Sequence, residues 1–199
     1  MSEPLARIAR ILQPIRDDDA AGSQLTTDRG ALAHNPAVAD VETIPGVVSI
    51  EDCKRIVQMA DTLRAAGAKR IPRQDETRWI YERVAEVFET ANRKFRFRVV
   101  GLIEEIVVTA HEPGDGYPWQ VDCSHNFTAN RKLSLSLLLT DTGPGGEGAL
   151  EFSGRETPAV PLAAGTAIVF PSFLAHRVKN RTQGRRVTLV AFAYGPTFE

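Results

Sequence analysis

The chain has 199 residues, 43% of them hydrophobic and 25% charged, an ordinary composition for a globular protein with one packed domain. The formal net charge of −1 provides no bulk attraction to nucleic acid or to an anionic membrane surface, so neither is an expected partner. Cys53 and Cys123 have neither the number nor the spacing of a disulfide framework or a zinc site. The N-terminus lacks a signal-peptide core, and no apolar run reaches membrane-span length, which together predict a cytoplasmic protein.

Residues 1–42 are predicted to form an N-terminal arm. Apolar residues at helical spacing predict a short helix, which Pro14 ends or kinks, and a loop rich in small and polar residues follows. The folded domain is expected to span residues 43–199, with a short strand at Val47-Val48.

Two helices are predicted near the start of this domain. The first covers residues 50–66; Ser49 can cap it with Asp52 as the capping partner, and Gly67 stops it. After a loop over residues 70–75, the second helix covers about residues 76–95, where aromatic and aliphatic residues form one apolar stripe.

From Phe97 onward the hydrophobic period changes from 3.6 residues to 2 residues, which is typical of strands. The clearest segment is Arg131–Thr140, where leucines at odd positions alternate with Ser134 and Ser136. Strands are predicted at about 96–101, 103–110, 118–123, 131–139, 149–152, 158–161, 166–170, 175–179 and 186–193. Many short strands separated by turn signals predict a β-sandwich or barrel, with the two helices covering one sheet.

Three side chains in this β-rich region are candidate metal ligands. Gln120 and Asp122 are two residues apart on a predicted strand, so both side chains point to the same face. His176 lies on a later strand and would reach the same pocket if the sheet folds over as a jelly roll. Without its context, Asp122 would be interpreted as a carboxylate at a turn or strand end, and His176 as a hydrogen-bonded core histidine. Both residue types, however, commonly bind metal ions.

Arg186 and Thr188 are candidates for an anion site beside that metal. An arginine facing into a barrel is costly unless it binds an anion, and its planar fork suits a carboxylate. Thr188 is two residues on, so it faces the same way and can donate a hydroxyl hydrogen bond. The alternative is an exposed arginine on an edge strand. A metal beside a buried carboxylate receptor suggests a bidentate keto acid anchored at its far end.

Five stretches in this order resemble the Fe(II)/2-oxoglutarate dioxygenase superfamily, particularly its prolyl-hydroxylase-like branch. They are Gly114–Trp119, Arg131–Ser136, Gly146–Phe152, Gly165–Val178 and Gly184–Leu189. The resemblance covers most of residues 44–199, and the segment 76–92 is similar to the helix that precedes the barrel in this branch. It implies a mainly β fold with flanking helices (α+β), namely a double-stranded β-helix with two N-terminal helices on one sheet.

The resemblance also implies roles for individual residues. Asp122 and His176 would be the carboxylate and the distal histidine of an iron-binding triad, while Arg186 and Thr188 would hold the distal carboxylate of 2-oxoglutarate. Fe(II), 2-oxoglutarate and O2 would be the metal and co-substrates, with ascorbate as a further candidate cofactor. The family couples decarboxylation of 2-oxoglutarate to succinate with oxidation of a substrate C–H bond. Here the substrate would be an amino acid, a peptide or a small natural product, and a homodimer is a candidate assembly.

The chain departs from the family pattern at three positions. Gln120 stands where the first triad histidine is expected, His111 where this branch often has a tyrosine facing the co-substrate, and Phe192 where a tryptophan is common. Gln120 has three interpretations: a weak ligand through its amide oxygen, a holder of metal-bound water, or the mark of a site that no longer binds iron. His111 would supply the missing imidazole or replace the tyrosine as a hydrogen-bonding group. His125 would compensate or be an exposed loop histidine.

Two hypotheses from different classes follow. The first is an active oxygenase with an altered triad, formed by Gln120, Asp122 and His176. The second is a catalytically silent relative that acts as a binding or partner protein. The presence of Arg186 beside a metal half-site favours the first, because an unpaired buried charge is expensive to retain.

Overall fold

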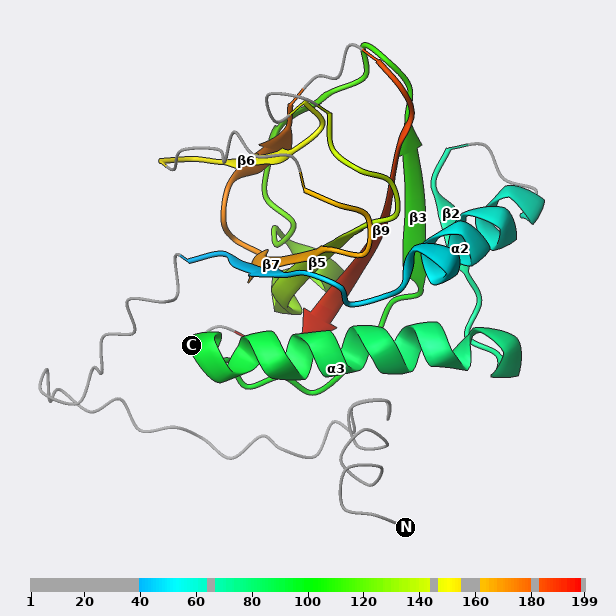
Figure 1. Ribbon diagram of the computed structural model, residues 1–199. Helices are drawn as coiled ribbons and strands as arrows, with labels where there is room; N and C mark the ends of the chain where they lie inside the picture. The colour runs from blue at the N-terminus through cyan, green and yellow to red at the C-terminus, as the bar shows by residue number, and fades with distance from the viewer. Residues whose placement is uncertain (1–39, 64–66, 144–146, 155–161, 180–182, 198–199) are drawn as a thin grey trace, which may run out of the picture.

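The computed structural model describes residues 40–63, 67–143, 147–154, 162–179 and 183–197 (Figure 1). The helix predicted in the N-terminal arm and the strand predicted at 158–161 lie outside these residues. Within them, no helix is long and apolar enough to cross a membrane.

Two helices lie on the N-terminal side of the domain, as predicted. Helix α2 (Ile50–Thr62) begins at Ser49, whose hydroxyl accepts a hydrogen bond from the Asp52 N–H at 3.0 Å, which confirms the predicted cap. The 3-10 turn η3 (Asp75–Thr77) leads directly into α3 (Arg78–Phe95). Helix α3 ends where Arg96 adopts a left-handed φ of 57°.

Nine strands form two antiparallel sheets within the described residues. The strands are β1 (Glu42–Ile44), β2 (Lys69–Ile71), β3 (Ile106–His111), β4 (Tyr117–Gln120), β5 (Arg131–Leu138), β6 (Leu150–Phe152), β7 (Ala167–Pro171), β8 (His176–Val178) and β9 (Arg186–Tyr194). The larger sheet has the order β1-β7-β5-β9-β3-β2, and the smaller has the order β4-β8-β6. The mixed architecture of two helices and two antiparallel sheets agrees with the predicted fold class.

Three local predictions were wrong. Val47-Val48 lies in a bend, because Pro45 and Gly46 form a turn that ends the strand at Ile44. Residues 96–101 form no strand, and only Gly101 makes an isolated bridge, to Tyr194. Conversely, residues 69–71 at the edge of the predicted loop form the edge strand β2, which pairs with β3.

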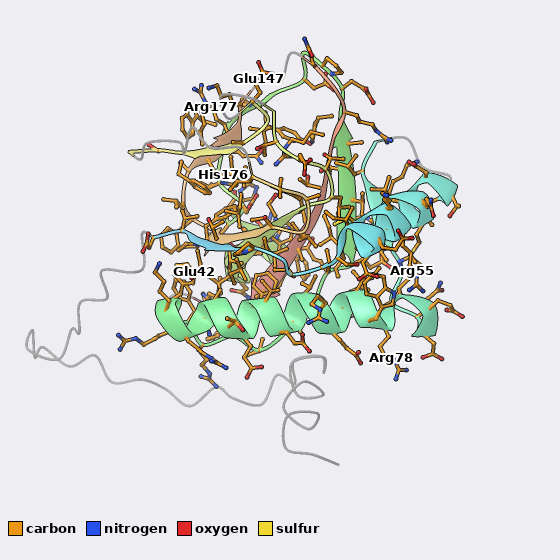
Figure 2. The ribbon with its side chains drawn as sticks, viewed as in Figure 1. Glu42, Arg55, Arg78, Glu147, His176 and Arg177 are labelled. Atoms are coloured by element: carbon orange, nitrogen blue, oxygen red, sulfur yellow. The ribbon has the colours of Figure 1, made fainter. Side chains whose placement is uncertain are left out.

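The helices and sheets enclose two apolar clusters. The larger cluster joins α2 and α3 to the outer face of the six-stranded sheet, and Figure 1 shows α3 running across that face. Leu133, Leu135 and Leu137 of β5 belong to it, as their alternation predicts. The smaller cluster lies between the two sheets and includes Phe152 and Phe170. Figure 2 shows His176 in this inner layer, whereas Arg55 and Arg78 lie on the helical surface.

Candidate active site

A cavity of about 310 Å³ opens between the two sheets, at the lower end of the usual size of small-molecule pockets. Its wall is formed by residues from β2 to β9, together with Glu104 and Asp122 outside the strands. The lining includes every residue predicted for the site: Gln120, Asp122, His176, Arg186, Thr188 and His111. The structure therefore brings these six residues to one cavity, while their roles as ligands stay predictions.

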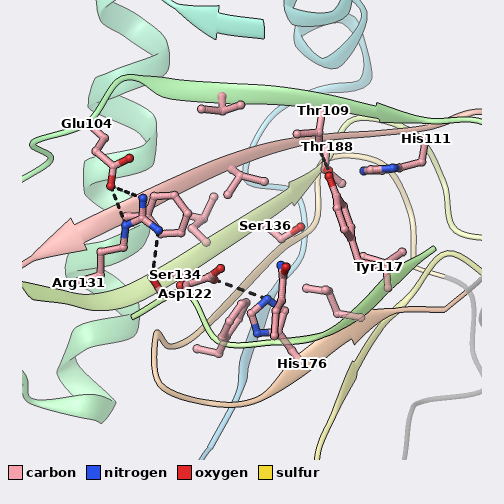
Figure 3. A pocket seen from close by; sticks show the side chains of 18 of the residues that line it. Glu104, Thr109, His111, Tyr117, Asp122, Arg131, Ser134, Ser136, His176 and Thr188 are labelled. Carbon is pink, nitrogen blue, oxygen red and sulfur yellow. Dashed lines mark hydrogen bonds and ion pairs between the residues drawn. The ribbon is translucent and has the colours of Figure 1, made fainter. Parts of the chain in front are cut away.

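Asp122 and His176 face each other in this cavity, with Asp122 Oδ2 3.6 Å from His176 Nε2 (Figure 3). Both side chains are largely buried, at 14% and 6% exposed. His176 Nδ1 lies 2.9 Å from the Leu174 carbonyl, a contact that assigns the ring proton to Nδ1 and directs the Nε2 lone pair toward Asp122. The arrangement resembles half of a metal site, in which main-chain contacts orient the ligand.

Gln120 reaches the cavity because of a β-bulge. On β4, Tyr117 pairs with Val178 and Gln120 pairs with His176, so three steps along β4 match two steps along β8. The extra residue brings Tyr117 and Gln120 onto the same face, although strict alternation would separate them. Asp122 lies just beyond the end of β4, where its N–H donates to the Ser172 carbonyl at 2.8 Å. The predicted strand 118–123 is therefore shorter, but its two predicted ligands do face one cavity.

Arg186 and Thr188 form a polar group on β9, and both are almost completely buried, at 3% and 1% exposed. The Arg186 guanidinium donates to the Gly148 carbonyl at 2.5 Å and to the Thr188 hydroxyl at 3.2 Å. Thr188 Oγ1 lies 3.0 Å from Thr109 Oγ1 on β3. A buried cation next to two hydroxyl groups is suited to bind a carboxylate that enters the cavity.

His111 lies beside this polar group, because it pairs directly with Arg186 across β3 and β9. Burial, and then the nearby Arg186 cation, lower the pKa of His111 below its ordinary value. The ring is therefore neutral at neutral pH and has one N–H to donate. Its Nε2 is buried and makes no hydrogen bond with other described residues. The Tyr117 ring packs against the His111 ring, with 4.7 Å between the two ring centroids.

Neither His111 nor His125 completes the half-site. Among the described residues, no three His, Cys, Asp or Glu side chains gather closely enough to hold a metal ion. His125 is exposed and pairs with the Ser124 hydroxyl at 2.6 Å. Gln120 lines the cavity and pairs with His176 across β4 and β8.

Asp122 and His176 nevertheless fit a shared metal ion. Two donors that each lie about 2.1 Å from one metal are about 3.0 Å apart at a right angle and about 3.4 Å apart at a tetrahedral angle. The 3.6 Å between Asp122 Oδ2 and His176 Nε2 requires only a small approach. One carboxylate and one imidazole suit a divalent transition metal such as Fe(II), for which an amide oxygen from Gln120 would be a weaker third donor.

Sequence reasoning missed a second polar cluster, formed by Glu104 and Arg131, which line the same cavity, and by Tyr194 beside them. Arg131 Nε donates to Glu104 Oε1 at 2.6 Å, and the Tyr194 hydroxyl donates to the same oxygen. The guanidinium stacks on the Phe192 ring, 3.6 Å from its centroid. Burial, followed by the hydrogen bond to Glu104, raises the pKa of Tyr194 far above its ordinary value, so its hydroxyl stays protonated as a donor. The alternation of the predicted strand placed Arg131 with Leu133, so the sequence offered no signal that assigned it to the cavity.

The sequence comparisons connect part of the chain to known hydroxylases. No family model matches it. A curated PKHD-type hydroxylase of Synechococcus sp. (strain CC9902) is 31% identical over 97 residues, which cover 48% of this chain and 44% of that protein. A PKHD-type hydroxylase of Prochlorococcus marinus is 30% identical over 98 residues, with the same two coverages. The chain thus spans less than half the length of these curated relatives.

The structural comparisons cover much more of the chain. The Pseudomonas putida prolyl-4-hydroxylase has a TM-score of 0.61 at 19% identity, over 80% of this chain and 95% of that one. The viral collagen prolyl hydroxylase of Paramecium bursaria chlorella virus-1 has a TM-score of 0.63 at 20% identity, over 89% and 99%. HygX of Streptomyces hygroscopicus, solved with nickel and 2-oxoglutarate, has a TM-score of 0.55 at 16% identity, over 81% and 84%. The chain therefore has the double-stranded β-helix fold of the prolyl hydroxylases, and about half of it is similar in sequence to PKHD-type hydroxylases.

Proposed function

We propose that this protein is a non-haem Fe(II)- and 2-oxoglutarate-dependent oxygenase of the hydroxylase type, with an altered metal triad. The observation that carries the proposal is the pairing of Asp122 Oδ2 and His176 Nε2, 3.6 Å apart, in one cavity with the buried Arg186 and Thr188. A metal half-site and a carboxylate receptor in one cavity match the two ends of a keto diacid. The names of the relatives, hydroxylases and prolyl hydroxylases, support the same reading.

Each group has a role in this proposal. Asp122 and His176 hold the iron, with Gln120 contributing its amide oxygen or a bound water. Arg186, Thr188 and neutral His111 bind the distal carboxylate of 2-oxoglutarate and fix its orientation. Bound iron and 2-oxoglutarate supply the oxidising chemistry with O2. The apolar wall of the cavity, including Phe170, excludes water from the reacting groups.

The substrate is proposed to be an amino acid, a peptide or a small natural product. The hydroxylation of a C–H bond is the proposed outcome, and Fe(II), 2-oxoglutarate and O2 are the proposed cofactor and co-substrates, with ascorbate as a candidate reductant. The cytoplasmic location and the homodimer stay predictions.

A second candidate is a catalytically silent binding protein with the same fold. The exposed side chain of Gln120 and the lack of a third His, Cys, Asp or Glu at the half-site among the described residues favour it. A neutral amide oxygen binds Fe(II) more weakly than imidazole does, so iron occupancy at cellular concentrations decides between the two candidates.

Anaerobic titration with Fe(II) and 2-oxoglutarate tests the choice, with the visible charge-transfer absorption as the readout of chelation. Succinate release after admitting air then measures turnover. We expect the band and succinate in the native protein, and neither in His176→Ala. If both are absent from the native protein and appear in Gln120→His, the silent-relative candidate replaces the active enzyme. If Gln120→His lowers an existing activity, the glutamine itself contributes to the reaction.

A further inference from the structure

A second β-bulge, at the start of β5, turns Arg131 into the cavity. Arg131 pairs with Tyr194 and Leu133 pairs with Ala193, so two steps along β5 match one step along β9. In a regular strand, Arg131 would share the helix-facing side of Leu133 and Leu135. The bulge instead places the guanidinium among the residues that line the cavity. Bulges of this kind beside a functional site typically redirect one side chain.

The redirected guanidinium is fixed on several sides. Two of its nitrogens, Nε at 2.6 Å and Nη2 at 2.5 Å, contact the single oxygen Oε1 of Glu104, and the two side chains are only 13% and 16% exposed. The Phe192 ring covers one face of the guanidinium. The Tyr194 hydroxyl donates to the same Glu104 oxygen. The guanidinium therefore has little rotational freedom, because two of its nitrogens and one of its faces are already in contact.

The remaining nitrogen of this guanidinium contacts the half-site. Arg131 Nη1 donates to the main-chain carbonyl of Asp122 at 3.0 Å (Figure 3). Asp122 lies beyond the last residue of β4, so no strand pairing fixes its carbonyl. On its other side, the Asp122 N–H is held by the Ser172 carbonyl at 2.8 Å. The peptide group before the Asp122 Cα is thereby anchored by main chain. The peptide group after it is anchored at both ends, by Arg131 at the Asp122 carbonyl and by the Cys123 N–H, which donates to the Ser172 carbonyl at 3.0 Å.

We infer that Arg131 is a positioning residue for the Asp122 carboxylate, and that Glu104 and Tyr194 act by holding Arg131 in place. The inference rests on the proposed function, since it assumes that Asp122 binds the metal. Arg131 touches neither the metal nor the substrate in this role. It sets the direction of Asp122 Oδ2 toward His176 Nε2 through the main chain, as outer groups do for ligands in other metal sites.

The metal affinity of Arg131→Met separates positioning from simple electrostatics. The variant removes a positive charge near a cation site and leaves Glu104 unbalanced, so charge alone would tighten the binding of Mn(II). Loss of the Asp122 anchor would weaken it instead. We expect the Mn(II) dissociation constant, measured calorimetrically without 2-oxoglutarate, to rise about tenfold, at the low end of the known effect of residues that orient ligands.

Arg131→Lys and a second cavity arginine complete the design. The lysine variant conserves the charge but loses the fork, so it can contact Glu104 or the Asp122 carbonyl but not both in the same geometry. We expect weaker Mn(II) binding and an altered Co(II) absorption spectrum, which reports ligand geometry. Arg70 lines the same cavity, and its side chain makes no ion pair or hydrogen bond with other described residues. Arg70→Met, the matched control, should bind Mn(II) at least as tightly as the native protein.

The outcomes separate this inference from the proposed function. Weaker Mn(II) binding in both Arg131 variants, at a temperature well below their melting points, supports the positioning role. Native or tighter affinity in Arg131→Met overturns it while leaving the oxygenase proposal intact. If Arg131→Met does not fold, an unchanged affinity and Co(II) spectrum in Arg131→Lys overturns it equally. A native protein that binds no Mn(II) removes both proposals.

Discussion

Substitution of Arg186 by methionine is expected to weaken the binding of 2-oxoglutarate without a comparable effect on 2-oxopentanoate, which has a methyl group in place of the distal carboxylate. Arg186 is 3% exposed and lines the cavity next to Thr188. A carboxylate bound there would receive two charge-assisted hydrogen bonds, each contributing about 1.5–2 kcal/mol to the binding free energy. Losing both costs about 3–4 kcal/mol, which corresponds to roughly 100- to 1000-fold in affinity.

The assay is calorimetric titration of the Mn(II)-loaded protein with each keto acid under nitrogen. The adjacent Arg185→Met is the matched control. Arg185 is 44% exposed, and its ion pairs with Asp61 and Glu112 are long, at 3.5 Å and 3.4 Å. Exposed pairs of this type contribute little, so this variant should bind both keto acids as the native protein does.

Two results would refute the reasoning. One is an affinity of Arg186→Met for 2-oxoglutarate within threefold of the native value, in a variant that retains a cooperative melting transition. The other is a native protein that binds 2-oxopentanoate as tightly as 2-oxoglutarate. Either result would mean that Arg186 is not the receptor for the distal carboxylate, whatever the metal site does.

Four further predictions concern stability and His111, the second proposed donor to the distal carboxylate. His111→Phe should weaken 2-oxoglutarate binding by roughly tenfold, the value of about one hydrogen bond. The pKa of His111 in the folded protein is lowered below 6.5, so the unfolded chain binds a proton at this site more readily. The free energy of unfolding should therefore fall as the pH drops below 6.5. In His111→Phe, this loss of stability at low pH should be smaller. Tyr81→Phe should lower the free energy of unfolding by about 1–3 kcal/mol in urea titrations, because the Tyr81 hydroxyl donates to the Ile71 carbonyl and accepts from the Ile106 N–H. Ser49→Ala should lower the free energy of unfolding by about 1 kcal/mol in the same titration, because the α2 cap is lost. An unchanged urea midpoint would contradict this prediction.

Much of the fold could be predicted because local patterns and tertiary packing agree. The leucines of β5 alternate with serines, and the structure places them on the helix side and the cavity side of one strand. The Ser49 cap depends only on contacts three residues apart. The edge strand β2 was missed because its three residues carry no alternation of their own. It forms because β3 offers an unpaired edge beside it.

The site was predictable in its members more than in its geometry. The spacing of Gln120 and Asp122 indicated a shared face, and they do share a cavity, but through a bulge and a strand end instead of a regular strand. Arg131 could not be assigned to the cavity by a period of two, since its odd position placed it with Leu133. A single inserted residue reverses the face of a side chain, and the sequence carries no local signal for the insertion.

The position of β9 in the larger sheet has a consequence for how the chain folds. β9 lies between β3 and β5, so Thr109 and Thr188, which are 79 residues apart, must meet before β3 gains its second partner. Contacts this distant slow folding, because the loop must close before any pairing stabilises it. A chain cut between β8 and β9 would leave one edge of β3 and one edge of β5 open at once. Such a fragment is expected to self-associate through these edges, with its helices and its half-site formed only in part.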